Sequence, residues 1–250
     1  MLRLAVHAVS SALSERVGSV AVRRIQPEVT LPWIYEADWA AQKEIDTSVG
    51  DHDPLSSCFW PASLPLAKLI AGSTARFEAE TVCELGCGTG LQSLAAASAG
   101  ASSVVATDVD PLSLALTAAA AAAQQLKAVQ TLEFDVFDGS VPLPTASILL
   151  LSDLFVTSAL ARAHARRVAE ALHAQSGFKL VLVVDPNRTT RACFLDELAV
   201  LGVQHDGFRP ADGIELTSLR GPAAHAQDAQ SQCELVLLST EEGAAVWFEI

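Results

Sequence analysis

The sequence predicts an α/β fold in which helices cover both faces of a mostly parallel sheet. Strand, glycine-turn and helix patterns alternate along residues 81–85, 91–99, 103–107 and 111–126. Because two parallel strands need a crossover connection, usually a helix, this alternation indicates a parallel sheet. The chain has 250 residues, of which 50% are hydrophobic, so it is long enough for one sizeable domain with a buried core.

The other expected elements extend this pattern. A helix is expected at residues 63–71, where apolar residues recur at helical spacing between Pro61 and Gly72. Further strands are expected at 131–134, 147–151 and 178–184, with helices at 158–174 and 190–201. After Gly202 the helical signal stops. Residues 213–219 and 233–239 then predict two strands joined by a polar loop, and residues 245–250 predict a last strand.

Residues 1–58 are expected to form an N-terminal segment ahead of a main domain at 59–250. The first 25 residues carry four arginines, four serines and the single acid Glu15, a composition typical of organelle transit peptides. Residues 17–25 alternate apolar and polar side chains, which favours a strand of a β-hairpin instead. Both interpretations stay open, because a short presequence could precede that strand. We expect an intracellular protein, mitochondrial or in another organelle if the leader is real and cytoplasmic otherwise.

The bulk composition excludes several classes of function. A formal net charge of -13 argues against a nucleic-acid partner and suits a basic one. No apolar stretch reaches the ~20 residues that a bilayer helix needs, so no membrane partner is expected.

The five cysteines lack CxxC spacing, which fits neither a disulfide framework nor a zinc site and favours a reducing compartment. The six histidines are expected in the N-terminal segment, on helix surfaces or in loops, and predict no metal site or proton relay. The oligomeric state is left open.

A glycine turn after the strand at 81–85 predicts a ligand site. Gly86, Gly88 and Gly90 let the backbone approach a ligand closely and point helix N-terminal amides at it. The spacing is GxGxG, whereas the dinucleotide fingerprint would place a glycine at Leu91. The next strand ends at Asp108, where a carboxylate can accept both ribose hydroxyls. This order of elements indicates an adenosine-containing cofactor.

Two further acids bear on which cofactor this is. NAD is the rival ligand, because it also presents a ribose. Glu84 lies just before the glycines, where an acid suits a cofactor with an amino group and a sulfonium and is awkward beside a pyrophosphate. This favours S-adenosylmethionine, although Glu84 could also be a solvated strand end. Asp135, just past the third strand, could accept from the adenine amino group or simply cap a turn.

With these residues in place, the chain resembles the seven-strand protein-lysine methyltransferases (protein-lysine methyltransferase family 16), and most of all the electron transfer flavoprotein β-subunit lysine methyltransferases. The resemblance runs from about Phe59 to Leu198. It is carried by Phe59-Trp-Pro-Ala62, Glu84-Leu-Gly-Cys-Gly-Thr-Gly90, Gly100-Ala-Ser-Ser-Val-Val-Ala-Thr-Asp-Val-Asp-Pro111, Ser152-Asp-Leu-Phe155 and Asp185-Pro-Asn-Arg188. The glycine motif is general to class I methyltransferases, whereas the Trp-Pro and Asp-Pro-x-Arg elements are narrower.

The resemblance implies a Rossmann-like, seven-stranded sheet with an antiparallel last strand, S-adenosylmethionine as cofactor and a protein lysine as substrate. It implies that Trp60 lies against the cofactor, that Asp108 binds the ribose and that Asp153 lines the substrate pocket. The full set of expected cofactor-binding residues is Trp60, Glu84, Gly86, Cys87, Gly88, Gly90, Asp108, Val109, Asp135, Val136 and Ser152. The expected substrate-binding residues are Asp153, Phe155, Asp185 and Arg188, with Asp153 also catalytic and no metal ligands.

The sequence departs from the family pattern at two places. Val156 stands where the family often has a tyrosine, and the helix after Asp110-Pro111 lacks the usual asparagine near Ala120. A small-molecule methyltransferase, or a cofactor-binding assembly partner that has lost catalysis, therefore remain alternatives. Trp60 could also be a core aromatic, and Asp153 a helix N-cap.

The expected chemistry is an in-line displacement, in which catalysis consists mainly of positioning the acceptor and excluding water. A lysine amine with a pKa of about 10.4 costs roughly 4 kcal/mol to neutralise near pH 7.4. A carboxylate at Asp153 raises that pKa, so we expect it to orient the amine by hydrogen bonding. Desolvation and the positive sulfonium favour the neutral amine.

Overall fold

The computed structural model describes residues 21–26, 29–33, 60, 62–173, 176–203, 209–210 and 234–239. Five of the described strands form the parallel centre of the main sheet in the order β5-β4-β3-β6-β7. They are β3 (Thr81–Leu85), β4 (Ser103–Asp108), β5 (Val129–Glu133), β6 (Ile148–Ser152) and β7 (Leu180–Asp185). The prediction of a mostly parallel α/β sheet is therefore confirmed.

The sheet continues past β7 with antiparallel pairing. Strand β9 (Glu234–Ser239) pairs antiparallel with β7, and the two-residue β8 (Arg209–Pro210) pairs with β9. The expected strands at 213–219 and 245–250 lie outside the described residues. The predicted full set of seven strands with an antiparallel last one therefore stays a prediction.

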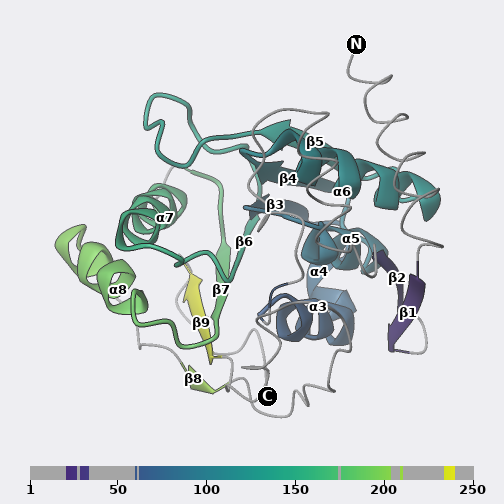
Figure 1. The fold of residues 1–250 in the computed structure, drawn as a ribbon, viewed down its shortest axis with the longest axis horizontal. Helices are drawn as coiled ribbons and strands as arrows, with labels where there is room; N and C mark the ends of the chain where they lie inside the picture. Colours follow the sequence, from purple (N-terminus) through teal and green to yellow (C-terminus); the bar gives the residue numbers. More distant parts are fainter. Residues whose placement is uncertain are drawn as a thin grey trace, which may run out of the picture.

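Helices cover both faces of the sheet, as Figure 1 shows. On one face lie α3 (Ser63–Gly72), α4 (Thr74–Phe77), α5 (Leu91–Ser98) and α6 (Pro111–Ala123); on the other lie α7 (Ser158–Ala171) and α8 (Arg191–Val200). Each face has its own buried cluster. The central strands β3, β6 and β7 are buried almost throughout, as parallel strands covered on both sides are.

The sequence placed some boundaries incorrectly. Helix α6 was expected to continue to residue 126 but ends at Ala123. Gln125 has φ 60°, a left-handed conformation that cannot continue a helix, and the chain turns there into β5. The single turn α4 was not predicted, because four residues carry too little periodicity to be recognised.

Two described strands lie in the N-terminal segment. Strand β1 (Ala21–Gln26) pairs antiparallel with β2 (Val29–Trp33) to form a hairpin. Whether a cleaved presequence precedes it stays a prediction.

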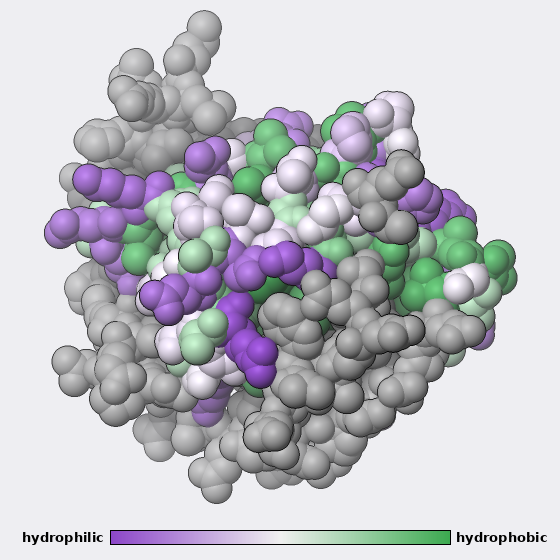
Figure 2. Space-filling view, turned by 180° about the vertical axis from the view of Figure 1, so that it is seen from behind, coloured by the Kyte–Doolittle hydropathy of each residue, from purple (hydrophilic) through white to green (hydrophobic). Residues whose placement is uncertain are grey.

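The end of α8 exposes apolar side chains. Val200 is 82% exposed and the adjacent Leu201 is 44% exposed. Figure 2 shows a group of hydrophobic residues (green) at the edge of the molecule where α8 lies. No helix in the described part of the chain is both long enough and apolar enough to span a bilayer.

The connectivity of the sheet defines a crevice between β3 and β6. From β3 the chain moves outward to β4 and β5, then crosses over to β6 and β7 on the other side of β3. The loops that follow β3 and β6 therefore diverge to opposite faces. In open α/β sheets this reversal of strand order is where ligands bind, outside the carboxyl ends of the strands.

A buried arginine on α7 fixes the loop that follows β5. The Arg167 side chain is 4% exposed, and its guanidinium donates to the carbonyl oxygens of Val136 (3.1 Å), Val141 (3.0 Å) and Asp138. It also pairs with Glu170 at 2.8 Å. These bonds satisfy loop carbonyls that would otherwise lack donors, and they set the position of Val136.

We expect Arg167→Met to lower the free energy of unfolding by about 2 to 4 kcal/mol, because several buried acceptors lose their donor together. The neighbouring Arg166, with a 63% exposed side chain paired to Glu197, provides the matched control. Arg166→Met should cost less than about 1 kcal/mol. Urea unfolding of both variants measures these losses of stability. Equal losses would contradict the conclusion that Arg167 holds the loop after β5 in place.

Candidate cofactor and substrate site

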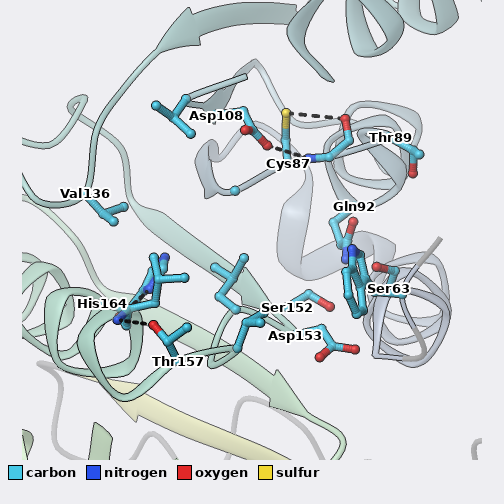
Figure 3. Close-up of a pocket in the computed structure, with 17 residues that line it drawn as sticks. Ser63, Cys87, Thr89, Gln92, Asp108, Val136, Ser152, Asp153, Thr157 and His164 are labelled. Atoms are coloured by element: carbon cyan, nitrogen blue, oxygen red, sulfur yellow. Dashed lines mark hydrogen bonds between the residues drawn. The ribbon is translucent and has the colours of Figure 1, made fainter. Parts of the chain in front are cut away.

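A cavity of about 310 Å³ lies at the carboxyl ends of β3, β4 and β6. Figure 3 shows its lining side chains converging from the glycine loop, the end of β4, the loop after β6 and helix α7. The residues predicted from the sequence that line it are Trp60, Gly86, Cys87, Gly88, Asp108, Val109, Val136, Ser152 and Asp153. Residues separated by more than 90 positions in the sequence thus form one wall of a single site.

Backbone hydrogen bonds hold the glycine loop in place. Cys87 N donates to the Thr107 carbonyl of β4 at 2.8 Å, and Gly90 N donates to the Cys87 carbonyl at 2.7 Å. Gly86, Gly88 and Gly90 all have positive φ, at 59°, 50° and 76°. Glycine adopts this conformation without the steric cost that a side chain brings.

Close packing also excludes side chains at two of these glycines. A Cβ on Gly86 would lie 2.5 Å from a methyl group of Leu154, and one on Gly90 would lie 2.4 Å from Thr117 Oγ1. The loop is thus fitted against both the segment after β6 and helix α6.

Asp108 closes β4 and faces the cavity. One carboxylate oxygen accepts from Gly88 N and the other from Asp110 N, each at 2.9 Å. The side chain is largely buried, and this burial raises the pKa of Asp108 above its ordinary value. The carboxylate therefore lies at the cavity wall with its outer lone pairs available to a ligand hydroxyl.

Glu84 lies beneath the glycine loop and does not line the cavity. One of its carboxylate oxygens accepts from Ser93 N at 2.9 Å and from the Ser93 hydroxyl, in the first turn of α5. Its burial raises the pKa of Glu84 to about 8. The buried position excludes the reading of Glu84 as a solvated strand end. Its direct contact with a cofactor stays a prediction.

Asp153 and Trp60 line the other end of the cavity, and Arg188, which does not line it, contacts both. Arg188 Nε and Nη2 both lie 2.6 Å from one Asp153 carboxylate oxygen, and the guanidinium carbon lies 5.2 Å from the centre of the Trp60 ring. The other Asp153 oxygen accepts from Ala62 N at 3.4 Å. Asp153 has φ 60°, a conformation that is costly for a residue with a side chain and that concentrates at functional sites.

The segment after β7 is built around Asp185. Its carboxylate accepts from Arg188 N at 2.8 Å and lies 3.9 Å from Arg191 Nε. Burial raises the pKa of Asp185 to about 6, with the nearby Asp153 charge adding to the effect. Asp185 does not line the cavity; its contacts position the backbone that carries Arg188.

Two other predicted site residues point elsewhere. Phe155 is 1% exposed and stacks on Phe194 with ring centres 4.4 Å apart, within the core beneath α7 and α8. Asp135 is exposed, and its carboxylate accepts from Phe137 N at 2.8 Å, as in a turn. The structure therefore brings neither side chain to the cavity.

The cavity also has lining residues that the sequence did not single out: Ser63, Thr89, Gln92, Leu154, Thr157, Leu160 and His164. Val156, which stands in place of the family tyrosine, lines it as well. Placing His164 on a helix surface was wrong, because the side chain is 3% exposed. Its position was detectable: Ala161, His164, Ala165 and Val168 are spaced as one buried face of a helix.

Sequence comparisons match parts of the chain to known methyltransferases. The family of ribosomal protein L11 methyltransferases (PrmA) matches residues 69–163. The electron transfer flavoprotein beta subunit lysine methyltransferase of Danio rerio is 32% identical over 111 residues, which is 44% of this chain and 42% of that protein. The chain thus matches less than half the length of this relative.

Solved structures agree on the architecture. A protein assigned as an RNA methyltransferase, from Pyrococcus horikoshii, aligns with 96% of this chain and 98% of its own at a TM-score of 0.51 and 13% identity. One assigned as an O-methyltransferase, from Nostoc punctiforme, aligns with 74% of this chain and 59% of its own at 0.51 and 14%. A third, assigned as a methyltransferase and solved with SAH, aligns with 72% and 50% at 0.50 and 18%.

The fold is that of the class I methyltransferases. Because the sequence identities to these solved structures are low, the likeness shows only that the fold is shared. The glycine loop and Asp108 lie at the crevice of that fold. Within the described part of the methyltransferase fold, no group of three or more His, Cys, Asp or Glu side chains could hold a metal ion.

The buried Glu84 predicts a specific pH dependence of stability. The folded protein keeps this proton up to about pH 8, whereas an unfolded glutamate releases it near pH 4.3. The folded state therefore binds more protons across this window, and the free energy of unfolding decreases as the pH rises through it. Glu84→Gln should reduce this loss by more than about 1 kcal/mol, since one pKa unit corresponds to about 1.4 kcal/mol.

The measurement is urea unfolding of both proteins at about pH 5.5 and pH 8.5, inside and above that window. Asp108 and Asp185 titrate in both proteins, so their contributions cancel in the comparison. An unchanged pH dependence in Glu84→Gln would show that Glu84 is ionised throughout.

Proposed function

We propose that this protein is an S-adenosylmethionine-dependent methyltransferase whose acceptor is a lysine side chain of a protein. The observation that carries the activity is the position of Asp108, held by Gly88 N at the end of β4 and facing the cavity. A carboxylate there accepts the paired hydroxyls of a ribose. The match to a lysine methyltransferase of Danio rerio supports the substrate class.

The residues present fit S-adenosylmethionine. Ser152 Oγ is buried at the cavity and has no hydrogen-bond partner among the described residues, so a ligand amino or carboxylate group could satisfy it. The glycine loop provides a surface without side chains, on which a nucleoside can lie close to the backbone. Asp108 would hold the ribose, and Trp60, Val109 and Val136 would supply apolar walls. When bound, the cofactor supplies a methyl group on a positively charged sulfur.

The Asp153–Arg188 pair affects the protonation state of the acceptor amine. A lysine amine must lose its proton, at a cost of roughly 4 kcal/mol near pH 7.4. A lone carboxylate would oppose that loss, but the Arg188 guanidinium 2.6 Å away compensates its charge. Asp153 can then accept a hydrogen bond from the amine and orient it, because the pair carries no net negative charge that would hold the proton on the amine. Trp60 lines this end of the cavity.

Two further features support the proposal. The net charge bears on the substrate, and the pairing of β9 bears on the extent of the domain. The net charge of -13 suits a basic, lysine-bearing partner. The antiparallel pairing of β9 with β7 supports the inference that residues 59–250 form one domain with a seven-stranded sheet.

Labelled methyl transfer tests the proposal directly. The purified protein is incubated with S-adenosylmethionine carrying a tritiated methyl group and with a cell extract, and the products are separated by size and acid-hydrolysed. Label in methyl-lysine of a protein band is expected. Label only in small molecules would make the acceptor a metabolite, and no label despite cofactor binding would leave an inactive cofactor-binding protein.

Asp108→Asn should weaken the binding of S-adenosylhomocysteine by about tenfold or more, because a charged acceptor for ribose hydroxyls is lost. Isothermal titration calorimetry measures this, with the exposed Asp196→Asn on α8 as the control expected to bind as the wild type does. If wild-type protein bound NAD and not S-adenosylhomocysteine, the cofactor assignment would be overturned.

Asp153→Asn should lower turnover by about tenfold to a hundredfold, since the group that positions the acceptor is weakened. The affinity for S-adenosylhomocysteine should stay within about threefold of the wild type, because Asp153 acts on the acceptor. Kinetics with the labelled protein substrate and calorimetry separate the two effects, and a thermal melt reports on folding. Parallel losses of turnover and affinity would refute this division of roles.

A further inference from the structure

His164 presents one unpaired nitrogen to the cavity. The side chain lies on the buried face of α7 and is 3% exposed, yet it lines the cavity. Figure 3 shows the imidazole beside Val136 and Thr157. Its Nδ1 lies 2.8 Å from the Leu160 carbonyl oxygen, one turn earlier on α7. Nε2 has no hydrogen-bond partner among the described residues.

The hydrogen bond to Leu160 fixes the tautomer of His164. A carbonyl oxygen can only accept, so Nδ1 must carry the proton and donate. Burial lowers the pKa of His164 to about 4, and the nearby Arg167 charge acts in the same direction. The imidazole is therefore neutral near pH 7, and its Nε2 offers a lone pair and no proton.

The chemistry of the cavity differs between its two ends. Figure 3 places Asp108 between Val136 and His164 on one side and Gln92, Ser63 and Asp153 on the other. The second end is polar and charged, as the amino-acid part of the proposed cofactor and the acceptor amine require. The first end is formed mainly by the apolar Val109 and Val136, which suit the faces of a flat base.

The Asp135 side chain does not line the cavity. This residue was the acceptor expected for the adenine amino group, but it is exposed and already accepts from Phe137 N. His164 is a buried side chain at this end with an available acceptor.

We propose that His164 is the residue that selects adenine: its Nε2 accepts a hydrogen bond from the exocyclic amino group of the base. This inference rests on the proposed function, because it takes the base to be that of S-adenosylmethionine. Adenine presents an NH₂ donor at this edge, whereas hypoxanthine presents a carbonyl oxygen. A neutral acceptor matches the first and repels the second, and a mispaired buried polar group is costly.

The test compares S-adenosylhomocysteine with S-inosylhomocysteine, whose base carries a carbonyl oxygen in place of the exocyclic amino group and a proton on the adjacent N1. Calorimetry should show that the wild type prefers the adenine form by about tenfold or more. His164→Asn should reduce that preference to within about threefold. An asparagine amide nitrogen can occupy the place of Nδ1 and keep the bond to Leu160, so this variant removes chiefly the group at Nε2.

His173→Asn, an exposed change just beyond the same helix, is the matched control and should keep the full preference. His164→Phe, which retains a ring beside Phe155, serves as the second variant if thermal melts show that His164→Asn is unfolded. An equal preference for adenine in wild type and the His164 variants, or no preference in the wild type, overturns the assignment to His164. Failure of folded wild-type protein to bind S-adenosylhomocysteine at all overturns the proposed function and this inference with it.

Discussion

The hydrogen bond from Gly88 N to the Asp108 carboxylate joins the two parts of the site that must act together. It connects the loop after β3 to the end of β4 at 2.9 Å. The neighbouring bond from Cys87 N to the Thr107 carbonyl holds the same two segments through their backbones. Because the loop is also packed against Thr117 of α6 and Leu154 after β6, its conformation is set from several sides. A ligand therefore meets a preformed surface, and little ordering is needed on binding.

Four acidic residues lie buried at or next to the site, where an ionised carboxylate is energetically unfavourable. Each is stabilised by different contacts. Glu84 accepts from the first turn of α5, where the helix dipole favours negative charge. Asp108 accepts from two backbone amides, and Asp153 pairs with Arg188. Asp185 accepts from the backbone of Arg188. The raised pKa of Glu84 and of Asp185 indicates that this compensation is incomplete.

The sequence predicted a feature of the fold or the site correctly where a single physical role explains the residue type at that position. The strand, glycine-turn and helix order predicts the parallel sheet, and Gly86 and Gly88 lie at the cavity as expected. Asp108 was identifiable because a strand end next to a glycine turn faces the same crevice. Asp153 and Arg188 were each expected near the substrate, but their direct contact was not, because the two residues are 35 positions apart and follow different strands. Their pairing depends on β6 and β7 being neighbours.

Side-chain direction was the information that the sequence lacked. Phe155 and Asp153 are two residues apart after the same strand, yet Phe155 packs into the core and Asp153 pairs with Arg188 beside the cavity. The left-handed backbone at Asp153 turns the chain there, and the residue type alone does not reveal it, because aspartate tolerates that conformation but adopts it at only a minority of positions. His164 was missed because a histidine is found both on buried and on exposed faces, although Ala161, Ala165 and Val168 mark the buried face of α7. Only the structure shows that this face of α7 also lines the cavity, through Leu160 and His164.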